Sequence, residues 1–231
     1  MLDQLPAEII CLILDFLKIE DLIKVSKINQ QFKTIISKYP NIGWKNIFVP
    51  ETIDNEEFVT LCEHSKQFEE FIVSGAVELM LMSPEADFFI FSALQYSINL
   101  HILQLDGTTI STLTFLRFLP NLEVLSLSYC LNLVSEDIIA LQWCHKIEQL
   151  YVSHTAIDAL ELTTVCMKEK FPNLFSVEAQ GIEFTYLQIC QLLNAVVKLS
   201  YFGLSLFPTL PLRTFNLAFK NRYTDIVWTI V

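Results

Sequence analysis

Cysteine and histidine are the residue types in this chain that could form a nucleophile with its base. Two Cys–His pairs stand close in sequence, Cys62 with His64 and Cys144 with His145, and His154 is a further base. Neighbouring side chains on a helix point about 100° apart, so Cys144 and His145 do not meet, and Cys62 and His64 diverge as well. The sequence therefore predicts no catalytic residue, and a cryptic hydrolase is its weakest interpretation.

Metal and cofactor sites are equally unsupported. The six cysteines are scattered and form no Cys-x-x-Cys motif, which excludes a zinc ribbon or a RING-like cross-brace on spacing. The chain has five glycines, and they form no Gly-rich loop that would cradle a phosphate. We expect no bound metal and no cofactor. The cysteines stand among apolar neighbours, which indicates reduced, buried thiols of an intracellular protein.

The net charge of −11 disfavours a nucleic-acid partner, because phosphates are neutralised by clustered Lys and Arg. No segment reaches the roughly 20 apolar residues of a membrane helix. Asp3 and Glu8 stand where a secretory signal carries positive charge. We therefore expect a protein of the cytosol or nucleus with no membrane partner. Its 231 residues fit one large domain, or a small domain and a medium one.

The first 48 residues predict a helical module. Pro6 and Glu8 fit the first turn of a helix, where proline loses no hydrogen bond and an acid faces the positive helix end. Apolar residues recur at helical spacing over residues 9–17 and again over residues 21–36. Residues 44–48 form a third short apolar segment. We therefore expect three short helices.

This module carries more apolar positions than three short helices of about 45 residues hide from one another. The surplus predicts that a partner or the following domain covers one helix face. Periodicity alone fits two interpretations equally well. One is a helical cap on the following domain, and the other is a module that docks onto another protein.

The order of the motifs favours docking. The motifs are Leu-Pro-x-Glu-Ile at residues 5–9, Asp-Leu-x-x-Val-Ser at residues 21–26, then Phe32 and Trp44. Together they resemble the F-box, a short helical module that binds a Skp-type adaptor. The resemblance implies that seven residues lie at or beneath the adaptor-binding surface. These are Leu5, Pro6, Ile9, Leu17, Leu22, Val25 and Trp44.

A second pattern, Leu-x-x-Leu-x-Leu, recurs through the rest of the chain. It starts at Leu100, Leu122, Ile147, Leu174 and Leu199, so successive starts are 22, 25, 27 and 25 residues apart. This spacing matches the roughly 20–29-residue period of leucine-rich repeats, whose three apolar positions point inward from a short strand. The segments between the strands predict helices. The sequence therefore predicts an α/β fold, with the helical module followed by a solenoid that contains a curved parallel sheet.

The two ends of the repeats are less regular. Residues 68–73 fit the same register as a first repeat, and residues 77–82 offer a competing register. Residues 212–217 indicate an irregular closing strand, and the apolar tail at residues 226–231 either packs as a cap or marks a shortened chain.

Three segments follow from these patterns. We place an F-box domain at residues 1–48, a helical linker at residues 49–67, and repeats with an irregular C-terminal cap at residues 68–231.

The segment from Leu125 to Cys144 resembles the cysteine-containing leucine-rich repeats that commonly follow an F-box in one family of ubiquitin-ligase receptors. The resemblance implies a buried turn position for Cys130. It also implies the substrate-recognition subunit of a Skp–cullin–F-box ubiquitin ligase, with a Skp-type adaptor, a cullin held through it, and a protein target as partners. Two alternatives stay open: an F-box scaffold that acts without ubiquitination, and a plain repeat protein with a helical cap.

The outward strand residues of a repeat solenoid line its concave face. In this chain they are polar to acidic and include two tyrosines, which are frequent interface anchors. The set is Gln104, Asp106, Ser126, Ser128, Gln149, Tyr151, Ser153, Glu178, Gln180, Tyr201 and Ser205. We expect them to bind a protein target with some basic character. The competing interpretation, that they are ordinary solvent-facing strand residues, has equal weight.

Overall fold

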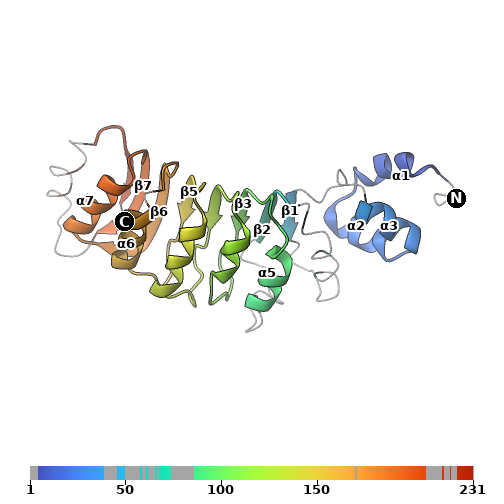
Figure 1. Cartoon of the computed structure of the whole chain (residues 1–231), viewed down its shortest axis with the longest axis horizontal. Helices are drawn as coiled ribbons and strands as arrows, with labels where there is room; N and C mark the ends of the chain where they lie inside the picture. The colour runs from blue at the N-terminus through green and yellow to red at the C-terminus, as the bar shows by residue number, and fades with distance from the viewer. Residues whose placement is uncertain are drawn as a thin grey trace.

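The chain forms an elongated molecule with helices at one end and a long sheet behind them (Figure 1). The computed structural model describes residues 5–38, 46–49, 58, 61, 66, 68–73, 86–169, 171–206, 215, 219 and 223–230. Three helices build the N-terminal end, which we call the head. Eight strands then follow in strict chain order as one sheet, β1 to β8. None of the described helices has the length and apolar character needed to cross a membrane.

The head contains α1 (Ala7–Leu14), α2 (Ile19–Ser26) and α3 (Gln30–Lys38). Its core consists of the apolar side chains that these helices turn toward each other: Ile10, Leu14, Leu22, Ile23, Phe32, Ile35 and Ile36, each at most 7% exposed. The first predicted helix is present as α1, whereas the predicted second helix, residues 21–36, is in fact two helices, α2 and α3. The Asn29 side chain accepts a hydrogen bond from the Phe32 N–H at 2.9 Å. This bond caps the start of α3 and separates it from α2.

The sheet is parallel throughout. Its strands are β1 (Asn46–Val49), β2 (Glu70–Val73), β3 (Ile102–Gln104), β4 (Val124–Ser126), β5 (Gln149–Tyr151), β6 (Ser176–Phe184), β7 (Tyr201–Leu206) and β8 (Val227–Ile230). One inward residue from each of five adjacent strands forms a buried column, in the order Phe71, Leu103, Leu125, Leu150 and Val177. This column confirms the predicted repeat register.

Two predictions at the ends of the sheet are corrected, and one choice between two registers is decided. Residues 46–48, predicted in the third helix of the F-box segment, form β1 together with residue 49 of the predicted helical linker, and β1 pairs with β2. Phe71 pairs with Leu103, which selects the first-repeat register at residues 68–73; the competing residues 77–82 lie outside the described chain. Phe215, expected in a closing strand, lies in a helical turn, and its ring packs edge-on against Trp228 at 5.0 Å.

The closing strand is β8, in the apolar tail. Trp228 pairs with Phe202 of β7 in the sheet, and their ring centroids are 5.8 Å apart. The tail therefore packs as a cap on the last repeat, which was one of the two expectations for it. The long strand β6 carries an irregularity between Ala179 and Glu183, where Gly181 adopts a φ of 82°.

Helical segments return the chain between strands, along one side of the sheet (Figure 1). They are α5 (Ala86–Leu94), the 3-10 helices η3 (Thr114–Phe118) and η4 (Ser135–Trp143), α6 (Ala159–Glu169) and α7 (Tyr186–Ala195). The sequence predicts helices between the strands, and two of these segments, η3 and η4, are 3-10 helices. Asp158 caps α6 by accepting hydrogen bonds from the N–H groups of Leu160 and Glu161.

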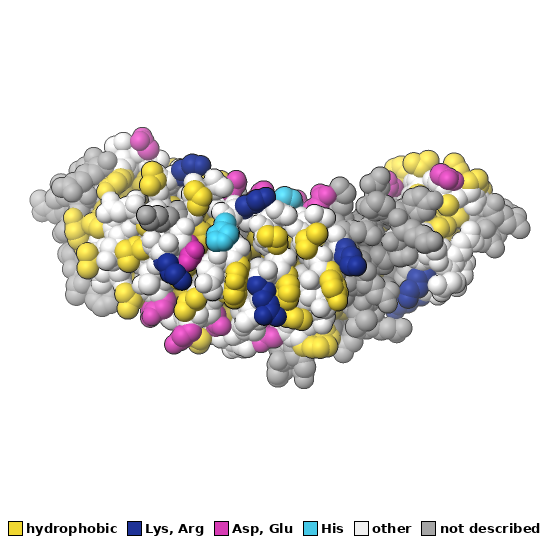
Figure 2. All heavy atoms as spheres, in the orientation of Figure 1, with side chains coloured by type: hydrophobic (Ala, Val, Ile, Leu, Met, Phe, Trp, Pro, Cys, Tyr) yellow, Lys and Arg dark blue, Asp and Glu magenta, His cyan; other side chains and the backbone are white. Residues whose placement is uncertain are grey.

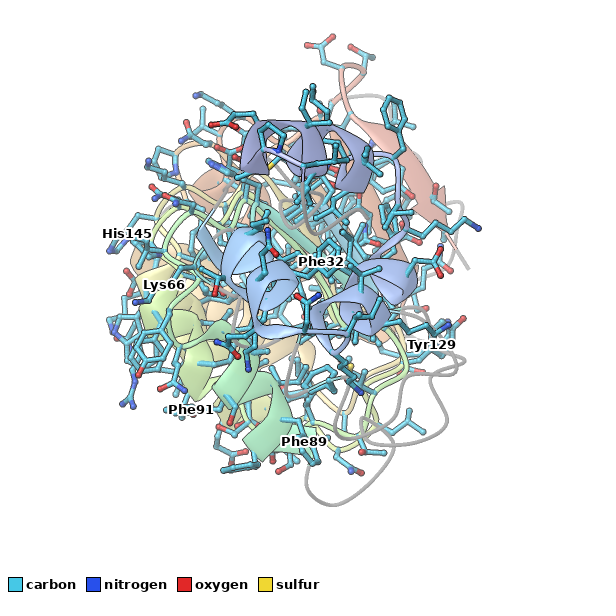
Figure 3. The ribbon with its side chains drawn as sticks, turned by 90° about the vertical axis from the view of Figure 1, so that its right-hand side faces the viewer. Phe32, Lys66, Phe89, Phe91, Tyr129 and His145 are labelled. Atoms are coloured by element: carbon cyan, nitrogen blue, oxygen red, sulfur yellow. The ribbon has the colours of Figure 1, made fainter. Side chains whose placement is uncertain are left out.

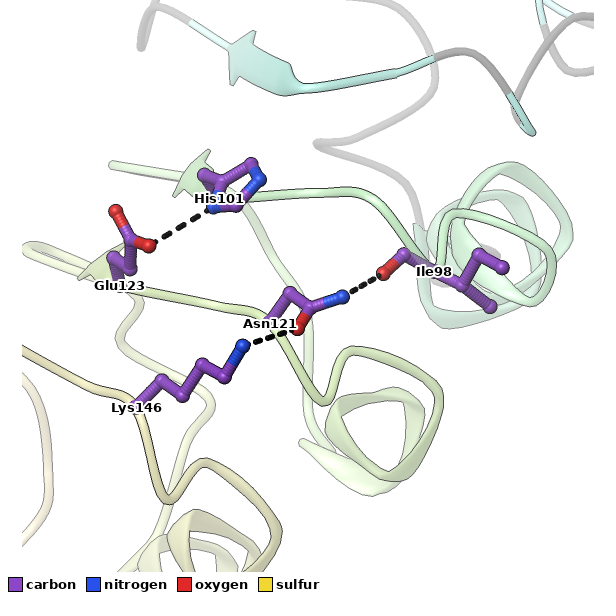
Figure 4. Close-up of polar contacts among 5 residues, drawn as sticks. All are labelled: Ile98, His101, Asn121, Glu123 and Lys146. Carbon is purple, nitrogen blue, oxygen red and sulfur yellow. Dashed lines mark hydrogen bonds and ion pairs between the residues drawn. The ribbon is translucent and has the colours of Figure 1, made fainter.

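Polar side chains join successive repeats near the amino ends of the strands (Figure 4). Asn121 donates to the Ile98 carbonyl at 2.8 Å and accepts from Lys146 Nζ at 2.7 Å. The same bridge occurs between Lys198 and Asn173 at 3.2 Å. These contacts lie at the solvent-exposed edge, so we expect them to set the repeat register more than to add stability.

Candidate interaction surfaces

The clearest exposed apolar surface lies on α1 and its flanking residues. It is formed by Leu5, Ile9, Leu12, Ile13 and Phe16, which we call the α1 stripe. These side chains are 36–90% exposed, and Phe16 reaches 90%. Their positions follow the i, i+4, i+7, i+8 spacing of one helix face, and Figure 2 shows hydrophobic side chains gathered over α1.

The opposite face of α1 is also apolar, because Ile10 and Leu14 are buried in the head. A helix that is hydrophobic on all sides is normally buried on all sides. Within the head, only one of the two faces is covered. Covering a large exposed apolar side chain contributes about 1.5–3 kcal/mol, so the α1 stripe is a strong candidate for a protein interface.

The residues predicted for adaptor binding fall into distinct environments. Leu5, Pro6 and Ile9 are exposed at the start of α1. Leu17 and Val25 are half-buried and pack against the core, and Leu22 is fully buried. Because they are buried or half-buried, these three residues support the surface from beneath. The remaining predicted residue, Trp44, lies outside the described residues.

Three members of the α1 stripe were not among the predicted contact residues. They are Leu12, Ile13 and Phe16, and Ile28 in the turn after α2 is similarly exposed. The signal that could have identified them is the helical spacing itself. Ile10 and Leu14 form one stripe and Ile9, Ile13 and Phe16 another, but the sequence does not say which of the two faces the core.

A second surface lies on the sheet face that the helices leave uncovered, which we call the open face. The structure brings nine of the eleven residues predicted for target binding together on it, and the other two, Gln149 and Ser205, lie on β5 and β7. Gln104, Ser126, Tyr151 and Glu178 pair in one row across β3 to β6. A second row follows at the carboxyl ends of these strands, and it contains Asp106, Ser128, Ser153 and Gln180. Tyr201 lies on β7, beside Glu178.

Asp106 anchors one hydrogen-bond network of the open face. Its Oδ1 accepts from Ser126 Oγ at 2.6 Å and from the Ser128 N–H at 2.8 Å. Both donors belong to the next repeat, and Ser126 is buried. This carboxylate therefore links two repeats as well as lying on the surface.

Glu178 anchors the other network. Its carboxylate accepts from Gln180 Nε2 at 3.2 Å and from the Tyr201 hydroxyl at 3.5 Å. Gly203, the neighbouring residue on β7, has no side chain to fill the space: a Cβ there would lie 3.1 Å from Glu178 Cγ and 3.2 Å from the Tyr201 hydroxyl oxygen. The arrangement holds a half-buried carboxylate and a tyrosine in fixed positions, as a binding surface requires.

Two of the described thiols, Cys144 and Cys166, are placed unfavourably for nucleophilic chemistry. Burial raises the pKa of Cys144 to about 12 and that of Cys166 to about 12. A thiol that stays protonated at neutral pH is a poor nucleophile. His145, the sequence neighbour of Cys144, is exposed. Cys130 is buried in the turn after β4 and donates to the Leu105 carbonyl at 3.0 Å, which confirms its structural position.

No cluster of three or more His, Cys, Asp or Glu side chains within the described residues is arranged to hold a metal ion. Cys62 and His64 lie outside those residues.

Comparison with known protein families identifies the head. Residues 2–42 match the F-box domain family. The chain carries an F-box domain. F-box domains generally bind Skp-type adaptors, and the α1 stripe lies in a domain of this type. A comparison with curated protein sequences finds no match.

Behind the F-box domain, the chain has the leucine-rich-repeat fold. A similar solved structure is an internalin C2 from Listeria monocytogenes, with a TM-score of 0.54 over 92% of each chain. The two sequences are 11% identical, so the likeness concerns the fold alone. F-box and leucine-rich-repeat domains are typically interaction modules without catalysis. In the repeats of this protein, the open face is the sheet surface that is left free for such an interaction.

Proposed function

We propose that this protein is the target-binding subunit of a Skp–cullin–F-box ubiquitin ligase. The F-box domain binds the adaptor through the α1 stripe, and the open face of the repeats binds the target protein. Such a subunit has no covalent step of its own. It raises the local concentration of target lysines near the conjugating enzyme, which is a proximity effect.

The observation that carries this proposal is the uncovered apolar face of α1 in a domain that matches the F-box family. A helical cap on the repeats would bury that face against them. Here it faces solvent, and Phe16 is 90% exposed. A helix presenting such residues fits a hydrophobic groove on a partner.

Co-purification from cells tests this function. A tagged form of the full chain is expected to retain a Skp-type adaptor together with a cullin. The reconstituted complex, supplied with activating and conjugating enzymes, is expected to transfer ubiquitin to proteins that bind the open face. Retention of the adaptor without a cullin would support the scaffold alternative. Retention of neither protein would support the alternative in which the head is only a helical cap on the repeats.

The target surface needs its own variant. Glu178→Gln keeps the shape of the side chain and removes its charge, so we expect weaker capture of a basic target with an unchanged melting temperature. Glu183→Gln is the matched control, because Glu183 is an exposed acid on the same strand beyond the open-face network. Equal capture of the target by the wild type and both variants would show that the Glu178 carboxylate is not part of the target site.

A further inference from the structure

One backbone position with a left-handed φ recurs in four successive repeats, just after β3, β4 and β5 and at the irregularity within β6. The residues are Gly107 (72°), Tyr129 (64°), His154 (57°) and Gly181 (82°). Gly107, Tyr129 and His154 each donate their N–H to a carbonyl in the next repeat, at 2.7–2.8 Å. The four residues therefore occupy equivalent positions, one repeat apart.

Glycine is the residue that this position favours, because a Cβ is strained at a left-handed φ. Two of the four repeats use it. Tyr129 and His154 carry large side chains at the same backbone conformation, and both are exposed. Gly107 and Gly181 show that the fold does not need rings here. Strain retained at exposed residues is a reason to look for a binding role.

The two rings form a stack with one free side. Their centroids are 4.7 Å apart and their planes differ by 18°. His154 lies against Gly181, because a Cβ on that glycine would be 2.8 Å from His154 Nδ1. Tyr129 is 58% exposed although His154 covers one of its faces, so its other face is open to solvent. That face is turned toward the repeat of Gly107, which has no side chain to cover it.

The charges around the stack select the ligand. None of the residues that β3 to β6 present on the open face, in the two rows above, is Lys or Arg, whereas Asp106 directly precedes Gly107 and Glu178 lies on β6. Lys66 and His145 lie on the opposite side of the repeats from Tyr129 (Figure 3). A cation is therefore favoured beside Tyr129.

We infer that the open face of Tyr129 binds an arginine side chain of the target protein. The guanidinium is planar and stacks on an aromatic face, and it carries the positive charge that the open-face carboxylates attract. A lysine ammonium lacks the flat shape, and an aromatic side chain lacks the charge. This inference rests on the proposed target-binding role of the repeats and names the residue type that they recognise.

NMR on the full chain with labelled Tyr and His side chains tests this site. The probes are Nα-acetyl-arginine methylamide, the matching lysine derivative, and the citrulline derivative, which has the shape of arginine without its charge. We expect the ring signals of Tyr129 and His154 to shift with the arginine probe, with an affinity about tenfold higher than for citrulline. Lysine is expected to bind more weakly than arginine.

Tyr129→Gly is the informative variant, because glycine already occupies this position in two of the four repeats. It should fold with an unchanged or higher melting temperature and lose the arginine response. Tyr129→Phe keeps the ring and should keep the response. Equal shifts with all three probes, or an arginine response that survives in Tyr129→Gly, would overturn the inference.

These outcomes are separate from the test of the ligase function. If Tyr129→Gly still captures the target while Glu178→Gln does not, the arginine site is wrong and the target-binding role stands. If the arginine response is present but no adaptor binds the F-box domain, the ligase function fails and the site remains.

Discussion

At the scale of single residues, Asp106 serves the fold and the candidate target surface together. Its Oδ1 accepts two hydrogen bonds from the next repeat, through Ser126 Oγ and the Ser128 N–H. Hydrogen bonds to a charged group contribute more than neutral ones, and losing the acceptor leaves the buried Ser126 hydroxyl without this partner. A substitution here cannot be interpreted as a loss of binding alone.

We expect Asp106→Ala to lower the free energy of unfolding by about 1–3 kcal/mol, measured by urea denaturation. Gln104→Ala is the control, because Gln104 is a half-buried open-face residue two positions earlier on the same chain segment. It should change stability by less than about 0.5 kcal/mol. If both variants unfold at the same urea concentration, Asp106 does not join the repeats.

Asp158 gives a pH-dependent test. The neighbouring Glu161 carboxyl, together with hydrogen bonds from the N–H groups of Glu161 and Leu160, holds the pKa of Asp158 below its usual value. A carboxyl with a lowered pKa in the folded state stabilises the protein above its ordinary pKa of about 3.9, and this contribution is lost as the pH falls through the folded value.

Asp158→Ala removes the cap of α6, so we expect a loss of about 1 kcal/mol at neutral pH that shrinks below about pH 4. Asp158→Asn keeps a capping oxygen without the charge and should retain most of the stability at neutral pH. Urea denaturation from pH 3 to pH 7 measures both. A deficit of constant size across this range would show that the charge of Asp158 plays no part.

At the scale of elements, β8 closes the repeats. Trp228 packs its ring against Phe202, Phe215 and Phe219 at centroid distances of 5.0–6.2 Å. Without this strand, β7 would expose both an unpaired edge and its aromatic side chains, which favours aggregation. The cap therefore contributes to solubility as well as to stability.

We expect Trp228→Ala to lower the free energy of unfolding by about 2–4 kcal/mol, since a partly buried aromatic side chain is lost. Val227→Ala on the same strand is the control, because Val227 is 63% exposed and should cost less than about 0.5 kcal/mol. Thermal and urea unfolding report the difference. Equal stability of the two variants would mean that β8 does not cap the repeats.

The repeat register could be predicted because each strand contributes the same three buried positions. Phe71, Leu103 and their equivalents recur in the sequence at the period that the sheet imposes. The ends could not be predicted as well. The break between α2 and α3 depends on the cap formed by Asn29, which a continuous apolar stripe conceals. Phe215 has strand-like spacing, but it packs against Trp228 from a helical turn.

The candidate sites were predicted unequally for the same reason. Alternation in a strand assigns each residue to one face, so the open-face residues could be located from their spacing. On α1 two apolar faces compete, and only packing decides that Ile10 is buried while Phe16 is exposed. The Tyr129–His154 stack depends on a left-handed φ, which no pattern of apolar residues reveals.

At the scale of the whole molecule, two surfaces of different chemistry lie on separate parts of one rod. The head offers an apolar helix face, and the repeats offer a polar to acidic sheet face. Apolar docking suits a constant partner, whereas charge and hydrogen bonds select among targets. This division is what a protein that joins a fixed adaptor to a chosen target requires.

The affinity of the full chain for a purified Skp-type adaptor, measured by calorimetry, tests the central claim that the α1 stripe is an interface. The account predicts binding with a negative heat-capacity change, because apolar surface is buried. Leu12→Glu combined with Phe16→Glu should weaken it at least tenfold with unchanged helical content, whereas Phe88→Glu, at an exposed position on α5, should bind normally. A folded, monomeric chain that binds no adaptor, or that binds equally well with both stripe residues charged, would contradict the account.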